Sequence, residues 1–340
     1  NIVLYPETIY NSAIVSEPTT FKSDHSYFIL TDVNFTSSVE FQPRAQIFIN
    51  PACMVKFYGA VTTPEFTSSR DMWKITSSKE IYSTSPVTMD FDSYYSAVNF
   101  YGDEINLKSG IVRYGSNGLA TININSTDLN YIVLRDCGVA LSINEGNLDA
   151  NYLVLFNCNN SGLIYVSDNV NNFNILISKC IVIGIKERGI SIEKAHYYNI
   201  SHCLLSNNNV YAIENKDCDG TIENCEFSTN YYDIYYDKSC LRNDILNNNF
   251  FNSILCIRLR GYINNINYNN FYGPSIYFIY IIYGIPPYSL VFSDVNATNN
   301  YWSVNNIDRY LADGNDDINC PYYILYIPIL NNPNISAGIK

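Results

Sequence analysis

Thiol chemistry is the first possibility that the sequence raises, because five cysteines recur through the middle of the chain at nearly constant spacing. The intervals between them are 21, 22, 23 and 22 residues, and the five are Cys137, Cys158, Cys180, Cys203 and Cys225. Cysteines at suitable spacing bind zinc, and neighbouring thiols form disulfides. No Cys-x-x-Cys or His-Glu-x-x-His pattern accompanies the five, so the sequence gives no zinc ligand set.

The residues around each cysteine predict the element that positions it. Each cysteine ends a four-residue phrase that begins with Leu or Ile, as in Ile200-Ser-His-Cys203, and asparagine takes its place at Asn248, Asn269 and Asn300. A fixed period of this length is typical of a solenoid. Short apolar runs between polar turns leave no room for helices. We therefore predict an all-β fold, a right-handed single-stranded parallel β-helix with coils of about 22 residues.

Stacked coils also predict where disulfides could form. Equivalent residues on successive coils lie about 4.8 Å apart, a separation that a disulfide can span. Cys218 and Cys240 are one coil apart and are the best predicted pair. For the five evenly spaced cysteines, free stacked thiols and bridges between coils both remain open. In either case we expect these positions to serve the scaffold.

Segments on both sides of the cysteine-rich region carry a family resemblance. They are Ser26–Thr36, Ile47–Pro51, Met54–Gly59, Phe66–Ser69 with Trp73, Ile105–Gly115, Asn299–Trp302, Asp313–Asp316 and Tyr326–Leu330. In this order they resemble secreted parallel β-helix repeat proteins of the pectin-lyase-like superfold, although Ser303 stands where those proteins usually have Gly. The resemblance implies the fold, and it is unspecific for function because such repeats occur in surface, adhesive and carbohydrate-active proteins. We expect a capping segment at residues 1–20, the β-helix at 21–330 and a tail at 331–340.

Composition limits the partners and the compartment. The net charge is −12 and charged residues make up only 15% of the chain, which argues against nucleic acid or anionic membrane as a partner. The longest apolar run, Ile276–Ile285, is too short to span a membrane, so no membrane insertion is expected. The sequence starts at Asn1 without a leader, as a mature or trimmed chain would.

Glycosylation motifs and cysteines favour a secreted, extracellular or cell-surface protein. The chain has ten cysteines and six Asn-x-Ser/Thr motifs, which begin at Asn34, Asn125, Asn159, Asn199, Asn296 and Asn334. An even cysteine count together with such motifs is typical of the secretory route.

Catalytic and metal-binding patterns are weak. A sugar-cleaving enzyme would need clustered acids with Arg or Lys on neighbouring coils. The densest charged run, Lys186–Arg188, reads as a solvated turn, and the histidines are His25, His196 and His202. The oxygen-rich Asp313-Gly-Asn-Asp316-Asp317 is a weak Ca²⁺ candidate without EF-hand spacing. We expect no other cofactor and no enzyme activity.

Tyrosine is unusually frequent, with 31 residues. Several of them should fall on the same part of successive coils, namely Tyr231, Tyr232, Tyr235, Tyr236, Tyr277, Tyr280 and Tyr283. Stacked aromatic rings can bind sugars or proteins, and Tyr can equally replace Phe at half-buried positions.

Three functional hypotheses follow. The leading interpretation is a non-enzymatic extracellular structural or adhesive glycoprotein, for example the subunit of a filament or coat that self-associates end to end. The alternative is a carbohydrate-binding or carbohydrate-cleaving β-helix protein that contacts glycans through the Tyr-rich face. The cleaving version requires Lys186, Arg188, Asp233 and Asp237 to lie together. A cell-surface recognition module is the third hypothesis.

Overall fold

The computed structural model has an all-β fold. It describes residues 8–11, 13–64, 71–82, 94–102, 104–167, 173–237, 240, 242–260, 265–273, 276–281, 295–304, 307, 311–312, 324–327 and 329–339. The predicted Ca²⁺ residues Asp313, Asp316 and Asp317 lie outside this part of the chain, as does Tyr283. The chain divides into two compact units, Asn1–Ile164 and Tyr165–Lys340.

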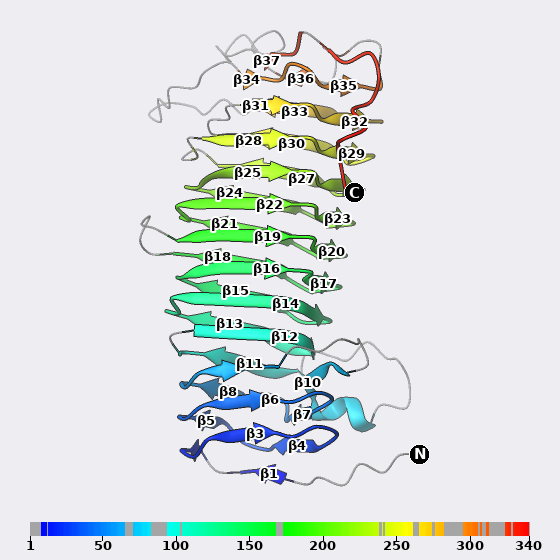
Figure 1. The fold of residues 1–340 in the computed structure, drawn as a ribbon. Helices are drawn as coiled ribbons and strands as arrows, with labels where there is room; N and C mark the ends of the chain where they lie inside the picture. The colour runs from blue at the N-terminus through cyan, green and yellow to red at the C-terminus, as the bar shows by residue number, and fades with distance from the viewer. Residues whose placement is uncertain are drawn as a thin grey trace, which may run out of the picture. The chain divides into compact units, whose positions relative to one another are not determined.

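Both units are parallel β-helix, as Figure 1 shows in blue to cyan for the first unit and in green to orange for the second. Strands of successive coils pair in parallel and form two sheets, which we call sheet A and sheet B. A connection between parallel strands of one sheet is right-handed in nearly all proteins, and the predicted right-handed parallel β-helix is confirmed.

The first unit contains these elements. In sheet A they are β1 (Thr8–Tyr10), β3 (Thr19–Phe21), β4 (Ser26–Ile29), β6 (Val39–Phe41), β7 (Gln46–Ile49), β9 (Val61–Thr62), β10 (Trp73–Ser77), β12 (Glu104–Arg113), β14 (Ser126–Arg135), β16 (Asn147–Asn151) and β17 (Val154–Phe156). In sheet B they are β2 (Ile14–Val15), β5 (Val33–Phe35), β8 (Met54–Phe57), β11 (Tyr95–Phe100), β13 (Gly115–Ile122) and β15 (Val139–Asn144). A short 3₁₀ helix, η2 (Ser78–Tyr82), follows β10, and β18 (Ser161–Val166) spans the boundary between the units.

The second unit repeats the same pattern. In sheet A its strands are β19 (Asn174–Ser178), β20 (Ile181–Ile183), β22 (Tyr197–Ser201), β23 (Leu204–Ser206), β25 (Asp219–Glu223), β26 (Glu226–Ser228), β28 (Asn243–Leu246), β29 (Asn249–Phe251), β31 (Asn265–Asn267), β32 (Asn270–Tyr272), β34 (Val295–Asn296), β35 (Tyr301–Trp302) and β37 (Ile324–Leu325). In sheet B they are β21 (Arg188–Glu193), β24 (Tyr211–Lys216), β27 (Tyr232–Tyr236), β30 (Leu255–Leu259), β33 (Tyr277–Ile281) and β36 (Leu311–Ala312).

Strand register confirms the predicted coil length. Ile200 pairs with Ile222, which pairs with Ile245, so these coils take 222 − 200 = 22 and 245 − 222 = 23 residues. In the first unit Leu107 pairs with Leu129, again 22 residues on. These isoleucines and leucines are at most 1% exposed, so each coil contributes one layer to a continuous apolar interior.

Aromatic rings stack inside both units. In the second unit Phe250 lies 5.0 Å from Phe227 and 4.8 Å from Phe271, ring centroid to ring centroid, with the rings nearly parallel. In the first unit Phe57 lies between Phe35 and Phe100 in the same way. Rings in register bury large apolar area without leaving gaps between coils.

The cysteine and asparagine positions play one structural role. The Sγ of Cys225 accepts a hydrogen bond from the backbone N–H of Cys203, and the Oδ1 of Asn248 accepts one from the N–H of Cys225 at 2.8 Å. Asn269 does the same for Asn248. Each of these side chains therefore satisfies a buried N–H of the preceding coil, which would otherwise be costly.

The nine described cysteines are free thiols. Eight of these thiols are buried and Cys53 is partly exposed. The disulfide predicted between Cys218 and Cys240 is therefore not present in this structure. Burial raises the pKa of Cys218 to about 12, so this thiol is unreactive at neutral pH.

The C-terminal segment is attached to the second unit by hydrogen bonds. Asn334 Nδ2 donates to the carbonyl of Tyr268 at 2.7 Å, and its backbone N–H donates to Asn270 Oδ1. The N–H of Gly338 donates to the carbonyl of Asn247. Nowhere in the described chain is there a helix with the length and hydropathy to cross a lipid bilayer.

Candidate functional site

A ladder of polar side chains runs through the second unit, and two of its members, Asn208 and Asn230, form the floor of a pocket. Asn208 Oδ1 accepts from the N–H of Ile185, Asn230 Oδ1 accepts from the N–H of Asn208, and Ser253 Oγ accepts from the N–H of Asn230. All three side chains are at most 2% exposed. Because their polar groups are used by the protein, this floor is rigid and closed to ligands.

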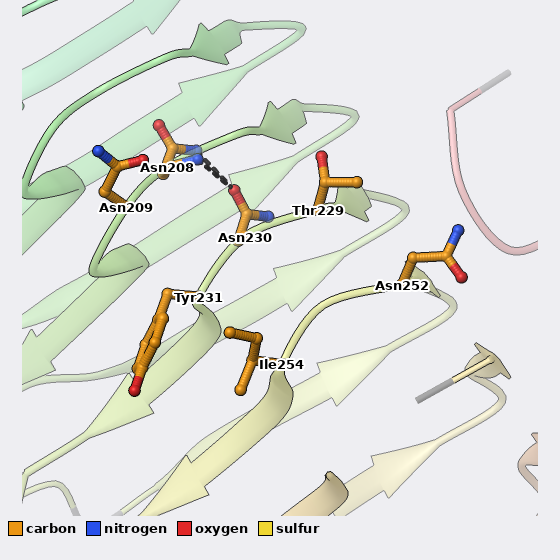
Figure 2. A pocket seen from close by; sticks show the side chains of 7 residues that line it. All are labelled: Asn208, Asn209, Thr229, Asn230, Tyr231, Asn252 and Ile254. Atoms are coloured by element: carbon orange, nitrogen blue, oxygen red, sulfur yellow. Dashed lines mark hydrogen bonds between the residues drawn. The ribbon is translucent and has the colours of Figure 1, made fainter. Parts of the chain in front are cut away.

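The pocket above this ladder has a volume of about 400 Å³. Figure 2 shows its lining, which comprises Asn208, Asn209, Thr229, Asn230, Tyr231, Asn252 and Ile254. These residues come from the turns that lead into β24, β27 and β30. No residue of the lining carries a formal charge, so the pocket offers amides, two hydroxyls, one aromatic ring and one aliphatic side chain.

Next to the pocket, sheet B carries a cluster that we call the tyrosine–arginine face, made of Tyr211, Tyr232, Tyr235 and Arg258. Tyr211 pairs in register with Tyr232, and their ring centroids are 5.4 Å apart; the centroid of Tyr235 lies 5.0 Å from that of Tyr211. Tyr231 of the pocket touches Tyr232 edge to face at 4.6 Å. The pocket and the face therefore form one continuous surface.

Arg258 covers this group of rings. Its guanidinium carbon lies 5.1 Å from the ring centroid of Tyr232 and 5.3 Å from that of Tyr235. Within the described part of the chain Arg258 forms no ion pair with a carboxylate. Stacking fixes the plane of the guanidinium and leaves its N–H groups free to bind an anion.

Glu214 lies two coils before Arg258 in the same line of register pairs, and its carboxylate has three partners. It accepts hydrogen bonds or ion pairs from Arg188 at 3.0 Å, Lys216 at 3.3 Å and Ser191 at 3.0 Å, and its side chain is 4% exposed. Tyr235 separates it from Arg258 in the column. These three partners hold the Glu214 side chain in place at the end of the face.

The hydroxyls of Tyr232 and Tyr235 remain protonated. Burial raises the pKa of Tyr232, and the positive charge of Arg258 only partly offsets this. Burial likewise raises the pKa of Tyr235. At neutral pH these hydroxyls are hydrogen-bond donors and not bases.

Asp233 lies directly under the site and is buried. Its Oδ1 accepts from Asn230 Nδ2 at 2.8 Å and from Ser253 Oγ at 2.6 Å. Its Oδ2 has no hydrogen-bond partner. Burial raises the pKa of Asp233 to about 7, against the opposing effect of those hydrogen bonds.

The structure corrects several predicted positions. Tyr235 and Tyr236 are both buried: Tyr235 is 8% exposed beneath Arg258, and Tyr236 is fully buried with its hydroxyl 2.7 Å from that of Tyr198. The cluster of Lys186, Arg188, Asp233 and Asp237 is not assembled: Arg188 pairs with Glu214, and Asp233 is in the interior. Tyr277 and Tyr280 do follow on the next coil, with ring centroids 5.4 Å apart.

Sequence reasoning missed Tyr211, Glu214 and Arg258. A signal was present, because each residue that follows a buried isoleucine of sheet B falls into one outward column. The column reads Ser191, Glu214, Tyr235, Arg258 and Tyr280. Aligning those isoleucines would have brought the charged residues to the tyrosines.

The predicted glycosylation residues differ in exposure. Asn125 is exposed, and the other five are half-buried. Asn199, Asn296 and Asn334 each use Nδ2 as a hydrogen-bond donor within the fold. Among the described residues no three His, Cys, Asp or Glu side chains are grouped to bind a metal.

Comparison with known proteins supports the fold. No protein-family model and no curated protein matches the chain. Among solved structures it is similar to the periplasmic alginate epimerase AlgG, with a TM-score of 0.55 and 10% identity over 90% of this chain and 77% of that chain. A mutant of the same epimerase gives a TM-score of 0.51 and 11% identity over the same shares.

This comparison overturns the leading functional interpretation. The two solved structures named above are of an alginate epimerase, whereas we expected a non-enzymatic structural or adhesive glycoprotein and no enzyme. The finding favours our alternative interpretation, a carbohydrate-binding or carbohydrate-cleaving β-helix protein, over the leading one.

Proposed function

We propose that this protein is a carbohydrate-active β-helix protein that binds an acidic polysaccharide on the tyrosine–arginine face of its second unit. The observation that carries the proposal is Arg258, a guanidinium stacked on two tyrosine rings and without a carboxylate partner among the described residues. A free guanidinium held in one plane suits the carboxylate of a uronic acid, which it binds with two hydrogen bonds.

The tyrosines supply the second part of this binding. Aromatic rings present an apolar face to the C–H groups of a sugar, and the protonated hydroxyl of the half-buried Tyr232 can donate a hydrogen bond. The face extends over β24, β27 and β30, which are successive strands of sheet B. Successive coils are about 4.8 Å apart, so an extended glycan can contact more than one rung.

The same arrangement suits chemistry on a uronate. Removal of the proton next to a carboxylate builds negative charge on that group, and a positioned guanidinium stabilises the charge. Arg258 would take only this charge-stabilising role in an epimerisation or an elimination, and the proton would pass to a base that Tyr232 and Tyr235 do not supply. The resemblance to a periplasmic alginate epimerase supports this substrate class and a location outside the cytoplasm.

Binding of acidic polysaccharides tests the proposal directly. Affinity electrophoresis of the full chain through gels that contain polygalacturonate or alginate should show retardation, and Arg258→Ala should remove it. Arg135→Ala is the matched control, because Arg135 also lies over a ring, that of Phe156, but is paired with Asp136 at 2.7 Å. Equal retardation of the wild type and Arg258→Ala would contradict the proposal.

Turnover requires a second measurement. Incubation with the polymer that binds best should give either an unsaturated product, seen by ultraviolet absorbance, or a changed ratio of uronate epimers, seen by nuclear magnetic resonance. Arg258→Lys keeps the charge and loses the planar fork, so it should bind the polymer more weakly and turn it over more slowly than the wild type.

A further inference from the structure

The pocket next to the tyrosine–arginine face differs from it in one chemical respect. Arg258 supplies a full positive charge to the face, whereas the pocket lining contains no charged side chain. A carboxylate placed in the pocket would lose hydration without gaining an ion pair, which is unfavourable. The pocket therefore selects against the group that the face selects for.

The rim of the pocket has free hydrogen-bonding groups, although its floor has none. Asn209 and Asn252 are exposed, and within the described part of the chain neither side-chain amide has a hydrogen-bond partner. They stand on opposite sides of the pocket in Figure 2. Each amide offers a donor and an acceptor, the combination that sugar hydroxyls and acetamido groups require.

Apolar contacts are available between those amides. Tyr231 is 44% exposed and Ile254 is half-buried, and both line the pocket. An aromatic ring and an aliphatic side chain suit the C–H surface of an uncharged sugar ring. Tyr231 also contacts Tyr232, so a sugar in the pocket would be adjacent to one on the face.

We infer that the pocket is a subsite for an uncharged sugar, so that the glycan recognised by this protein carries neutral or acetamido sugars beside its uronic acids. This inference rests on the proposed function and narrows its substrate class from polyuronates to mixed acidic glycans.

Calorimetric titration of the full chain with two probes of equal length tests the subsite. An oligogalacturonate is acidic at every residue, whereas a hyaluronan oligosaccharide alternates glucuronate with an uncharged acetamido sugar. The wild type should bind the hyaluronan oligosaccharide about tenfold more tightly, which corresponds to one or two added hydrogen bonds.

Variants of the rim should remove this preference alone. Asn209→Ala combined with Asn252→Gly deletes both free amides, and Gly suits the positive φ of 52° at Asn252. Asn224→Gly is the matched control, since Asn224 also has a φ of 52° and is not part of the pocket lining. The double variant should bind both probes equally, and the control should retain the tenfold difference.

The possible failures are distinguishable. If the wild type binds both probes equally, or if the double variant keeps the preference, the subsite is refuted and the acidic-glycan function stands. If the wild type binds neither probe nor any other acidic polysaccharide, both the function and the subsite are refuted.

Discussion

The two units contain the same kind of arginine–aromatic contact but treat the charge in opposite ways. In the first unit Arg113 lies 4.6 Å from the ring centroid of Tyr114, and it also pairs with Glu80 and, at 3.3 Å, with Asp136. In the second unit Arg258 contacts only rings among the described residues. A charge whose partners lie on neighbouring coils stabilises the stack, whereas a charge without partners is available to a ligand.

The acidic groups of the two units show the same contrast. Burial alone would raise the pKa of Glu80, but a hydrogen bond from Thr76 and the charges of Lys74 and Arg113 outweigh it and lower this pKa. Asp233 in the second unit has hydrogen bonds but, within the described part of the chain, no cation beside it, and burial raises its pKa to about 7. Ionisable groups that lack a partner of opposite charge are therefore the places where function should be sought.

Replacing Asp233 should have the largest effect on stability. Its pKa is about 7 in the folded protein and about 3.9 in the unfolded chain, so the folded state holds the proton more tightly. The contribution of Asp233 to the free energy of unfolding is therefore highest below about pH 4 and falls by roughly 4 kcal/mol as the pH rises to about 7. Asp233→Asn keeps the acceptor oxygen and has no charge, so urea denaturation should show this fall only in the wild type.

Supplying the missing partner to Arg258 should make the second unit resemble the first. Arg258 pairs in register with Tyr280, so Tyr280→Glu places a carboxylate beside the guanidinium. We expect binding of acidic polysaccharide to weaken about 10- to 100-fold, the effect of losing a hydrogen bond to a charged group. The glutamine in Tyr280→Gln has the same shape as the glutamate but no charge, so this variant should bind acidic polysaccharide nearly as the wild type does. A similar loss of binding in both variants would contradict the charge argument.

Removing a partner in the first unit should affect stability and leave glycan binding unchanged. Glu80→Gln should lower the free energy of unfolding by about 1–2 kcal/mol at neutral pH, a range that allows for the partial exposure of the network. Because the folded pKa of Glu80 is lowered, the wild type has this stability above about pH 4.3 and loses it as the pH falls through the folded pKa.

The two denaturation curves should therefore converge in acid. Asp24→Asn serves as the control, since Asp24 and its partner Arg44 are more than half exposed and this change should have almost no effect. A Glu80→Gln variant as stable as the wild type at neutral pH would show that the network contributes nothing.

Exposed tyrosine stacks should have the smallest effect. Tyr131 and Tyr152 stack on the first unit with centroids 4.6 Å apart and without an arginine in the pair. Tyr152→Ala should cost less than about 1 kcal/mol and should not change glycan binding. Tyr232→Ala should weaken glycan binding several-fold, and equal effects of the two variants on binding would remove the distinction between the stacks.

Much of the fold could be predicted because the repeating phrase is a local signal. Whether the position holds Cys225 or Asn248, the side chain accepts the N–H of the preceding coil, so both residue types mark the same rung. The backbone conformation of the residue that precedes this cysteine or asparagine was not predicted. Asp136, His202 and Asn224 all have a φ between 52° and 55°, which explains a turn position where polar residues vary but their backbone conformation does not.

The site was harder to predict because it depends on which neighbours meet across coils. Strict alternation along β27 would place Asp233 and Ile234 on opposite faces, yet both are fully buried. Tyr235 reaches the outer column and Tyr236 turns inward to Tyr198. Two adjacent residues of the same type thus have different surroundings, and these surroundings decide which of the two can contact a ligand.

The sequence by itself determined the period, the coil and the parallel stacking, because each coil must satisfy its own turns with residues that recur at the same place. Only the tertiary structure decided that Arg113 has carboxylate partners and that Arg258 has none among the described residues. Register between coils is set by backbone hydrogen bonds and interior packing, and outward side chains meet as a consequence of it. The chemistry of the surface therefore follows from the stacking of coils and not from the composition of any one coil.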